Sequence, residues 1–198
     1  MPKLENTRRL ISGHIAPPLA RLLARTPLTP NSLTWIGFFI TAGAAALIVT
    51  GHMLVAGIVV VAAGLFDMLD GAVARATGRV TRFGAILDST LDRLCEAMLL
   101  LALLVVFARE QQVGWCLLSG VAMLGSLMVS YIRARIEGLG VECKAGIFTR
   151  PERVAIMALG LLLSNINYAL VIAVGLLALF SFITVIERLV YAWRNLKD

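Results

Sequence analysis

Charged residues are scarce in this chain. Asp, Glu, Lys and Arg make up 15% of its 198 residues, whereas a soluble domain has about a quarter. Hydrophobic residues make up 59%. This composition excludes an ordinary soluble globular domain and predicts an integral membrane protein.

Cysteine and histidine are also rare. The three cysteines, Cys95, Cys116 and Cys143, show no paired spacing, and only two histidines are present. A disulfide framework or a zinc site requires sets of closely spaced ligands, so neither is expected. The first 30 residues lack a continuous apolar core, so no signal peptide is predicted there.

Apolar segments divide the chain at intervals that suit transmembrane helices. A span needs about 20 mostly apolar residues, and six segments are expected to cross the membrane. They are Asn31–Thr50, Met53–Ala76, Arg82–Phe107, Val113–Glu137, Glu152–Leu163 and Tyr168–Ala192. We interpret residues 1–198 as one all-α membrane domain with a six-helix bundle over 31–195. Apolar residues alternate with arginines over 1–28, which predicts either an amphipathic helix in the membrane interface or a plain basic anchor.

Basic residues lie almost entirely on one side of these six segments. Seventeen of the 18 lysines and arginines fall near the termini or near the second and fourth connections, and Arg109 is the exception. The positive-inside rule makes this side cytoplasmic, so both termini are expected in the cytoplasm of a cell-membrane protein. Attraction to anionic lipid headgroups accounts for the net charge of +6, and no nucleic-acid partner is implied.

Four aspartates interrupt the second and third apolar segments. Asp67 and Asp70 are three residues apart, and Asp88 and Asp92 are four apart, so each pair shares one face of a helix. A short cytoplasmic turn joins the two segments, which are expected to be antiparallel neighbours with both pairs at a similar depth. Ionisable residues in such surroundings indicate a functional site.

The four carboxylates predict a divalent cation site. Like charges this close raise one another's pKa, and one or two hard cations would relieve the repulsion. Carboxylate and water ligands suit Mg²⁺ or Mn²⁺, and such ions keep open positions for substrate phosphates. Gly71 would let a ligand come close, and Arg75 could hold a phosphate. Salt bridges from the aspartates to nearby arginines are the alternative.

The spacing of these residues resembles a family signature. The pattern D-x2-D-G-x2-A-R-x8-G-x3-D-x3-D is that of the CDP-alcohol phosphotransferases, and every position is met between Asp67 and Asp92. The resemblance implies six transmembrane helices, usually in a homodimer, around a polar cavity that faces the cytoplasm. It also implies a reaction in which an alcohol hydroxyl attacks a phosphorus of a CDP-linked lipid and CMP leaves.

The same resemblance assigns roles within the motif. Asp67, Asp70 and Asp88 would be metal ligands, and Asp92 would share a second metal or act as the base that takes the proton from the attacking hydroxyl. The expected CDP-binding residues are Asp67, Asp70, Gly71, Ala74 and Arg75.

A second, basic cluster surrounds the join of the fourth and fifth segments. Its five cations are Arg133, Arg135, Lys144, Arg150 and Arg153. Membrane topology alone would explain such a loop. The alternative is a pocket for a phosphorylated acceptor, because arginine forms forked hydrogen bonds with phosphate oxygens.

Several short motifs are similar to those of the phosphatidylinositol phosphate synthases, a branch of the same family. They are Thr29–Thr34 with Gly37, Phe83–Arg93, Ser130–Gly140 with Gly146, and Arg150–Arg153. This resemblance implies that CDP-diacylglycerol is the donor and inositol phosphate the acceptor. It also implies that the basic cluster holds the acceptor's phosphate, with Arg188 and Arg194 as candidate additions. One departure is Leu94-Cys95-Glu96, where such synthases often carry a serine and an acid.

Other functions stay open from the sequence. The same chemistry could use glycerol 3-phosphate or another alcohol as acceptor, or an ether-linked CDP-lipid as donor. A divalent-cation transporter would also place aspartates on helices, although such sites tend to lie near the bilayer midplane. A non-catalytic membrane scaffold would not depend on the aspartates.

Overall fold

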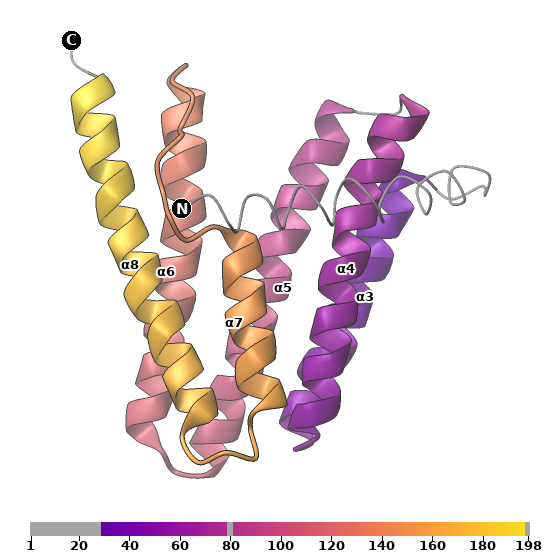
Figure 1. Cartoon of the computed structure of the whole chain (residues 1–198), viewed down its shortest axis with the longest axis vertical. Coiled ribbons are helices and arrows are strands. Elements are labelled where there is room, and N and C mark those ends of the chain that lie inside the picture. The colour runs from indigo at the N-terminus through magenta and orange to yellow at the C-terminus, as the bar shows by residue number, and fades with distance from the viewer. Residues whose placement is uncertain (1–28, 79–80, 197–198) are drawn as a thin grey trace.

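Six helices make up the regular structure of the described residues. The computed structural model describes residues 29–78 and 81–196, without the side chains of 68–73 and 75–77. The helices are α3 (Pro30–Val49), α4 (Met53–Thr77), α5 (Arg82–Arg109), α6 (Val113–Gly138), α7 (Arg150–Leu162) and α8 (Ala169–Asn195) (Figure 1). Each begins and ends within three residues of the segment expected from the sequence, which confirms the all-α class. The amphipathic helix predicted over 1–28 lies outside the described residues.

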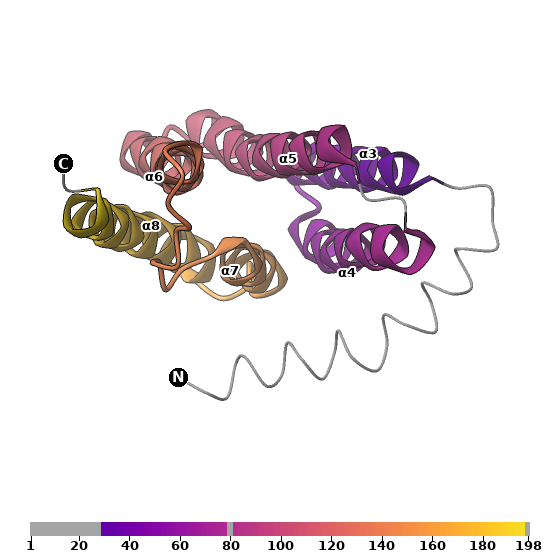
Figure 2. The same cartoon turned by 90° about the horizontal axis from the view of Figure 1, so that it is seen from above.

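The six helices form a closed ring. Their main contacts run from α3 to α4, α7, α8, α6, α5 and back to α3. Seen from one end, the ring consists of two rows, α3–α5–α6 and α4–α7–α8 (Figure 2). The sequence predicted that α4 and α5 would be packed neighbours, but each of them packs mainly against α3. Helix α3 contacts both, and its buried residues include Thr41, Ala44 and Ile48.

The apolar core lies at one end of the ring, where short connections join α3 to α4, α5 to α6, and α7 to α8 (lower part of Figure 1). Its buried side chains come from the late turns of α3, α5 and α7 and the early turns of α4 and α8, and they include Ile48, Val60, Leu103, Leu161 and Val174. This end is closed by apolar packing. The aspartates and the basic cluster belong to the opposite end.

The outer surface of the ring is also apolar. Phe39, Leu65, Ile86, Leu117 and Trp193 are each more than half exposed, which is unusual in a soluble protein and suits contact with lipid. Three helices, α3, α6 and α8, are long and apolar enough to cross a membrane. Helix α4 has a shorter apolar stretch, Met53–Asp67. Helix α5 carries the charges of the acidic motif, and α7 has only 13 residues.

Candidate active site

Three of the four predicted aspartates meet between α4 and α5. Asp67, Asp88 and Asp92 each offer one carboxylate oxygen, and these oxygens lie within 4.8 Å of one another. All three residues are half-buried. We call them the carboxylate trio. A compact set of oxygen donors fits a hard divalent cation such as Mg²⁺ or Mn²⁺.

The other residues of the motif follow on the last turns of α4. Asp70, Gly71 and Arg75 belong to this helix, but their side-chain surroundings lie outside the described part of the chain. Ala74 is half-buried. Asp70 follows Asp67 by three residues on α4, about one helical turn.

A guanidinium group joins two members of the carboxylate trio. Nη1 of Arg150 lies 2.5 Å from Oδ2 of Asp67, and Nη2 lies 2.8 Å from Oδ1 of Asp92. Arg150 is the first residue of α7, so these two ion pairs connect three helices. Its remaining donor, Nε, is buried without a hydrogen-bond partner among the described residues.

A capping box fixes the turn that carries Arg150. Thr149 is the N-cap of α7, and its backbone N–H donates to the Glu152 carboxylate at 2.9 Å. The Thr149 hydroxyl donates to the same carboxylate. Such a box satisfies amides that have no partner within the helix. It therefore holds Arg150 and Arg153, which are three residues apart, on one face of the first turns.

Arg153 makes a second ion pair that is more deeply buried. Its Nε lies 2.8 Å from Oε1 of Glu96, and the two side chains are 4% and 10% exposed. Nη1 of Arg153 is buried and has no hydrogen-bond partner in the described part of the chain. A buried donor of this kind needs an explanation such as a ligand or a water molecule. No role was predicted for Glu96, although it lies four residues after Asp92 and so on the same face of α5.

These ion pairs line a cavity of about 280 Å³ between α5, α6, α7 and α8. Five arginines and three acids contribute to its wall, so its charge favours an anion. The arginines are Arg93, Arg133, Arg150, Arg153 and Arg188, and the acids are Asp92, Glu96 and Glu137. We call it the arginine-lined cavity. Asp92 is a member of the carboxylate trio, and Arg150 contacts the trio. Both residues also line the cavity, so the cavity and the trio adjoin.

Arg188 also lines the cavity. From the sequence it was only a candidate addition to the residues that hold the acceptor's phosphate. It is 3% exposed. Its Nε donates to the carbonyl of Ala145 at 3.1 Å, and its Nη1 donates to the carbonyl of Val129. Arg188 therefore ties α8 to α6 and to the connection before α7. An arginine in an apolar span was the signal that could have identified it.

The five predicted acceptor-site cations do not all reach the cavity. Arg133, Arg150 and Arg153 line it, whereas Arg135 and Lys144 are absent from its wall. Arg135 is two residues from Arg133, and so points about 200° away around the helix. Lys144 is exposed and lies 3.2 Å from the Glu142 carboxylate.

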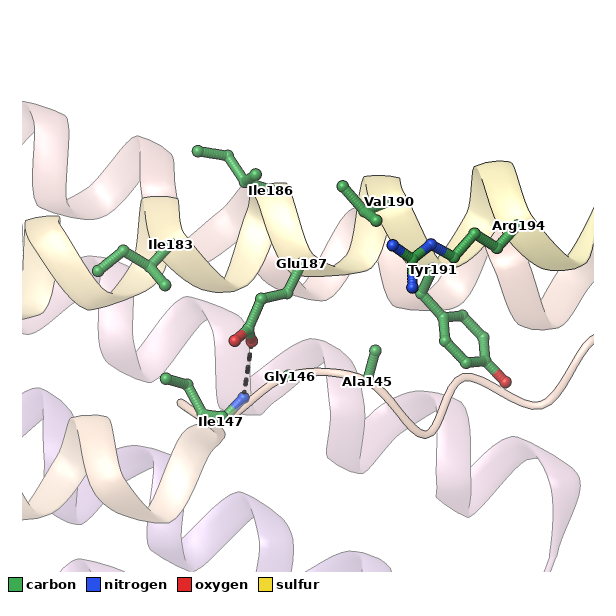
Figure 3. Close-up of a pocket in the computed structure, with 9 residues that line it drawn as sticks. All are labelled: Ala145, Gly146, Ile147, Ile183, Ile186, Glu187, Val190, Tyr191 and Arg194. Atoms are coloured by element: carbon green, nitrogen blue, oxygen red, sulfur yellow. Dashed lines mark hydrogen bonds between the residues drawn. The ribbon is translucent and has the colours of Figure 1, made fainter.

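A second and larger hollow, of about 530 Å³, lies between α8 and the connection before α7 (Figure 3). Isoleucine and valine side chains form much of its wall, and Arg194 lies at one end (Figure 3). Its one carboxylate, that of Glu187, accepts a hydrogen bond from the backbone N–H of Ile147 at 3.2 Å. Arg194, a candidate addition to the acceptor site, lines this hollow, but none of the predicted aspartates and none of the five cations of the basic cluster does. The smaller cavity is therefore the candidate active site.

Comparison with known proteins identifies the class. Residues 27–187 match the family described as CDP-alcohol phosphatidyltransferase. The chain belongs to this family. Family membership favours a transferase over the cation transporter and the scaffold that the sequence left open.

Two relatives are named as synthases of inositol phosphate lipids. The phosphatidylinositol phosphate synthase of Corynebacterium glutamicum is 37% identical over 186 residues, which cover 91% of this chain and 85% of that protein. The archaetidylinositol phosphate synthase of Pyrococcus horikoshii is 40% identical over 191 residues, which cover 94% of this chain and 97% of that protein.

The fold is similar to that of a solved relative, the phosphatidylinositol phosphate synthase of Mycobacterium tuberculosis. Its crystal structure with CDP-DAG bound has a TM-score of 0.83 and 36% identity, covering 90% of this chain and 94% of that one. A second crystal structure, in complex with manganese and citrate, also has a TM-score of 0.83, with 37% identity, and covers 90% of this chain and 89% of that one.

Proposed function

We propose that this protein transfers the phosphatidyl group of CDP-diacylglycerol to inositol phosphate and releases CMP. One observation carries the proposal: a cluster of carboxylates suited to a divalent cation adjoins a cavity with an excess of arginine. The first feature suits a pyrophosphate donor, and the second suits an acceptor that carries its own phosphate. The names of the relatives support both substrates.

Asp67, Asp70, Asp88 and Asp92 are the proposed ligands of one or two Mg²⁺ or Mn²⁺ ions. The close approach of the three described carboxylates supports this assignment, as does the manganese in the M. tuberculosis structure. When bound, the cation would neutralise charge on the pyrophosphate and on the departing CMP. Gly71, Ala74 and Arg75, together with Asp67 and Asp70, are the proposed contacts of the CDP group.

Asp92 is the proposed base, because it belongs to both the carboxylate trio and the wall of the arginine-lined cavity. Its carboxylate would accept the proton of the acceptor hydroxyl as that oxygen forms a bond to the lipid-linked phosphorus. The bond between that phosphorus and the CMP oxygen breaks in the same displacement. Sharing in metal binding is the second role that the family resemblance allows for Asp92.

Arg133, Arg150 and Arg153 are the proposed contacts of the acceptor's phosphate, and Arg188 joins them. Nη1 of Arg153, which has no hydrogen-bond partner among the described residues, is the donor best suited to an incoming oxygen. Arg135 and Lys144 lie on the exposed surface beside this site. We propose that these two attract anionic headgroups and substrates rather than bind the acceptor's phosphate.

We propose that all six helices span the cell membrane, with both termini and the active site in the cytoplasm. We also propose that residues 1–198 form one domain and that two copies pair as a homodimer. The distribution of basic residues supports this orientation, because in the described part of the chain Arg109 is the one basic residue at the opposite end. The apolar outer surface supports the membrane location. Helix α7 spans only about 20 Å at 1.5 Å per residue, so the connection before it would lie below the membrane surface.

An ether-linked CDP-lipid is a second candidate donor. The P. horikoshii relative is named for an archaetidyl lipid, and it is slightly more similar to this chain than the C. glutamicum relative. The two names share inositol phosphate and differ in the lipid. They therefore support the same acceptor and leave two donors to compare.

A panel assay of the purified protein tests the proposal. CMP release is measured with CDP-diacylglycerol and Mg²⁺, and the acceptors are inositol phosphate, free inositol, glycerol 3-phosphate and serine. Of the four acceptors, we expect only inositol phosphate to give rapid CMP release. A matched Asp88→Asn variant should release no CMP with any of them. Equal release with glycerol 3-phosphate would contradict the acceptor assignment. Repeating the panel with an ether-linked CDP-lipid decides between the two donors.

A further inference from the structure

Arg150 contacts two of the three carboxylates that could bind a divalent cation. Its two terminal nitrogens each contact a different carboxylate of the carboxylate trio, at 2.5 Å for Asp67 and 2.8 Å for Asp92. A bound cation would take up oxygens of these two groups at about 2.0–2.2 Å. It would also place two positive charges beside the positive guanidinium. A bound cation would therefore weaken the hold of Arg150 on the carboxylate trio.

The Arg150 side chain can move from the carboxylate trio into the arginine-lined cavity. It already lines the arginine-lined cavity together with Arg133, Arg153 and Arg188, and 26% of it is exposed. The capping box holds the backbone of this turn in place, so a rotation of the side chain is enough for the move. Arg153 differs, because its pair with Glu96 is almost fully buried and touches no member of the carboxylate trio.

We propose that Arg150 couples the metal site to the acceptor site. In the absence of a divalent cation its guanidinium neutralises Asp67 and Asp92. When a cation binds, the guanidinium is released into the arginine-lined cavity, where it can hold the acceptor's phosphate. The metal and the phosphorylated acceptor then bind cooperatively, because each favours the same position of Arg150. The acceptor half of this inference rests on the proposed function, whereas the competition for the carboxylates does not.

The competition is tested by measuring Mn²⁺ affinity without any turnover. Free Mn²⁺ is followed by electron paramagnetic resonance as it is titrated into the purified full-length protein, its Arg150→Gln variant and its Arg133→Gln variant. Arg133 is the matched control, since it lines the same cavity but pairs with Glu137 at 2.8 Å instead of with the carboxylate trio. We expect Arg150→Gln to bind Mn²⁺ about fivefold more tightly or better, in the usual range of coupling between sites. Arg133→Gln should stay within about twofold of the wild type, because its charge is exposed and screened.

Two outcomes of this titration would overturn the proposal. Arg150→Gln could bind Mn²⁺ no more tightly than the wild type, which would mean that Arg150 does not compete for the carboxylates. Alternatively, Arg133→Gln could tighten binding as much as Arg150→Gln, which would reduce the effect to a general loss of positive charge.

Release of the side chain is tested on the wild-type protein, so that the result does not depend on how a variant folds. Phenylglyoxal, which modifies accessible arginines, is applied with and without Mn²⁺, and the labelled positions are identified by mass spectrometry. We expect Mn²⁺ to increase the labelling rate of Arg150 and to leave that of Arg133 unchanged. An unchanged rate at Arg150 would refute the release. Neither measurement depends on the acceptor, so failure of the panel assay would refute the proposed function and leave the competition standing.

Discussion

The buried pair between Arg153 and Glu96 allows a quantitative test of the site. The two side chains are 4% and 10% exposed and lie 2.8 Å apart. Glu96→Gln would keep the shape of the acid and remove its charge, so that Arg153 would be left charged and uncompensated. Removing one partner of a buried pair costs about 3–5 kcal/mol. For a chain of this length, 1 kcal/mol shifts the melting temperature by about 2–4 °C, so we expect a fall of at least about 6 °C.

Melting is measured on the detergent-purified protein by size-exclusion chromatography after heating. Glu137→Gln is the matched control, because Glu137 also pairs with an arginine at 2.8 Å, but those side chains are 52% and 41% exposed. An exposed pair contributes about 1 kcal/mol or less, so this variant should melt within about 4 °C of the wild type. If Glu96→Gln melted no lower than Glu137→Gln, the argument from a buried charge would be wrong.

A double variant separates stability from acceptor binding. Glu96→Gln combined with Arg153→Met removes both charges, so most of the lost stability should return. The arginine that we assign to the acceptor's phosphate remains absent. The loss of a hydrogen bond to a charged group costs about 1.5–3 kcal/mol, which predicts a fall of about 10- to 150-fold in kcat/KM for inositol phosphate. Wild-type kcat/KM in the double variant would refute the role of Arg153.

Three further predictions follow from the same geometry. Asp92→Asn should still bind CDP-diacylglycerol in a binding assay but lose turnover by about 100-fold or more, as expected for a missing general base; near-normal turnover would sink that role. EDTA should abolish CMP release, and added Mg²⁺ or Mn²⁺ should restore it, while persistent activity in EDTA would argue against the metal site. Gly146→Ala should raise the KM for inositol phosphate and spare that for CDP-diacylglycerol, because the φ angle of Gly146 is +117° and an added Cβ would lie 2.9 Å from Nε of Arg188. A KM that rises equally for both substrates would point to a general loss of structure.

The helices could be predicted closely from the sequence because their signals are local. Apolar runs give the length of each helix, and threonine N-caps mark where three of them begin. Thr29 accepts a hydrogen bond from the backbone of Ser32, Thr81 accepts one from that of Gly84, and Thr149 belongs to the capping box. The meeting of Asp67 with Asp88 and Asp92 was also predicted, because a short turn joins their helices.

The contacts between distant segments could not be predicted in the same way. The pairing of Arg153 with Glu96 and of Arg150 with Asp67 depends on how α7 lies in the ring, and no local pattern encodes that position. The position of α3 against both α4 and α5 has the same origin. The basic cluster also divides in the structure: Arg133 lines the cavity and Arg135 does not, because residues two apart on a helix point to different sides.

The identity of the lipid product tests the central claim most directly. Purified protein is incubated with CDP-diacylglycerol, inositol phosphate and Mg²⁺, and the lipids are analysed by mass spectrometry while CMP is quantified in the same sample. We predict a phosphatidylinositol phosphate in a one-to-one ratio with CMP, and neither product from an Asp88→Asn variant. CMP released without that lipid, or an unchanged pool of CDP-diacylglycerol, would contradict the account.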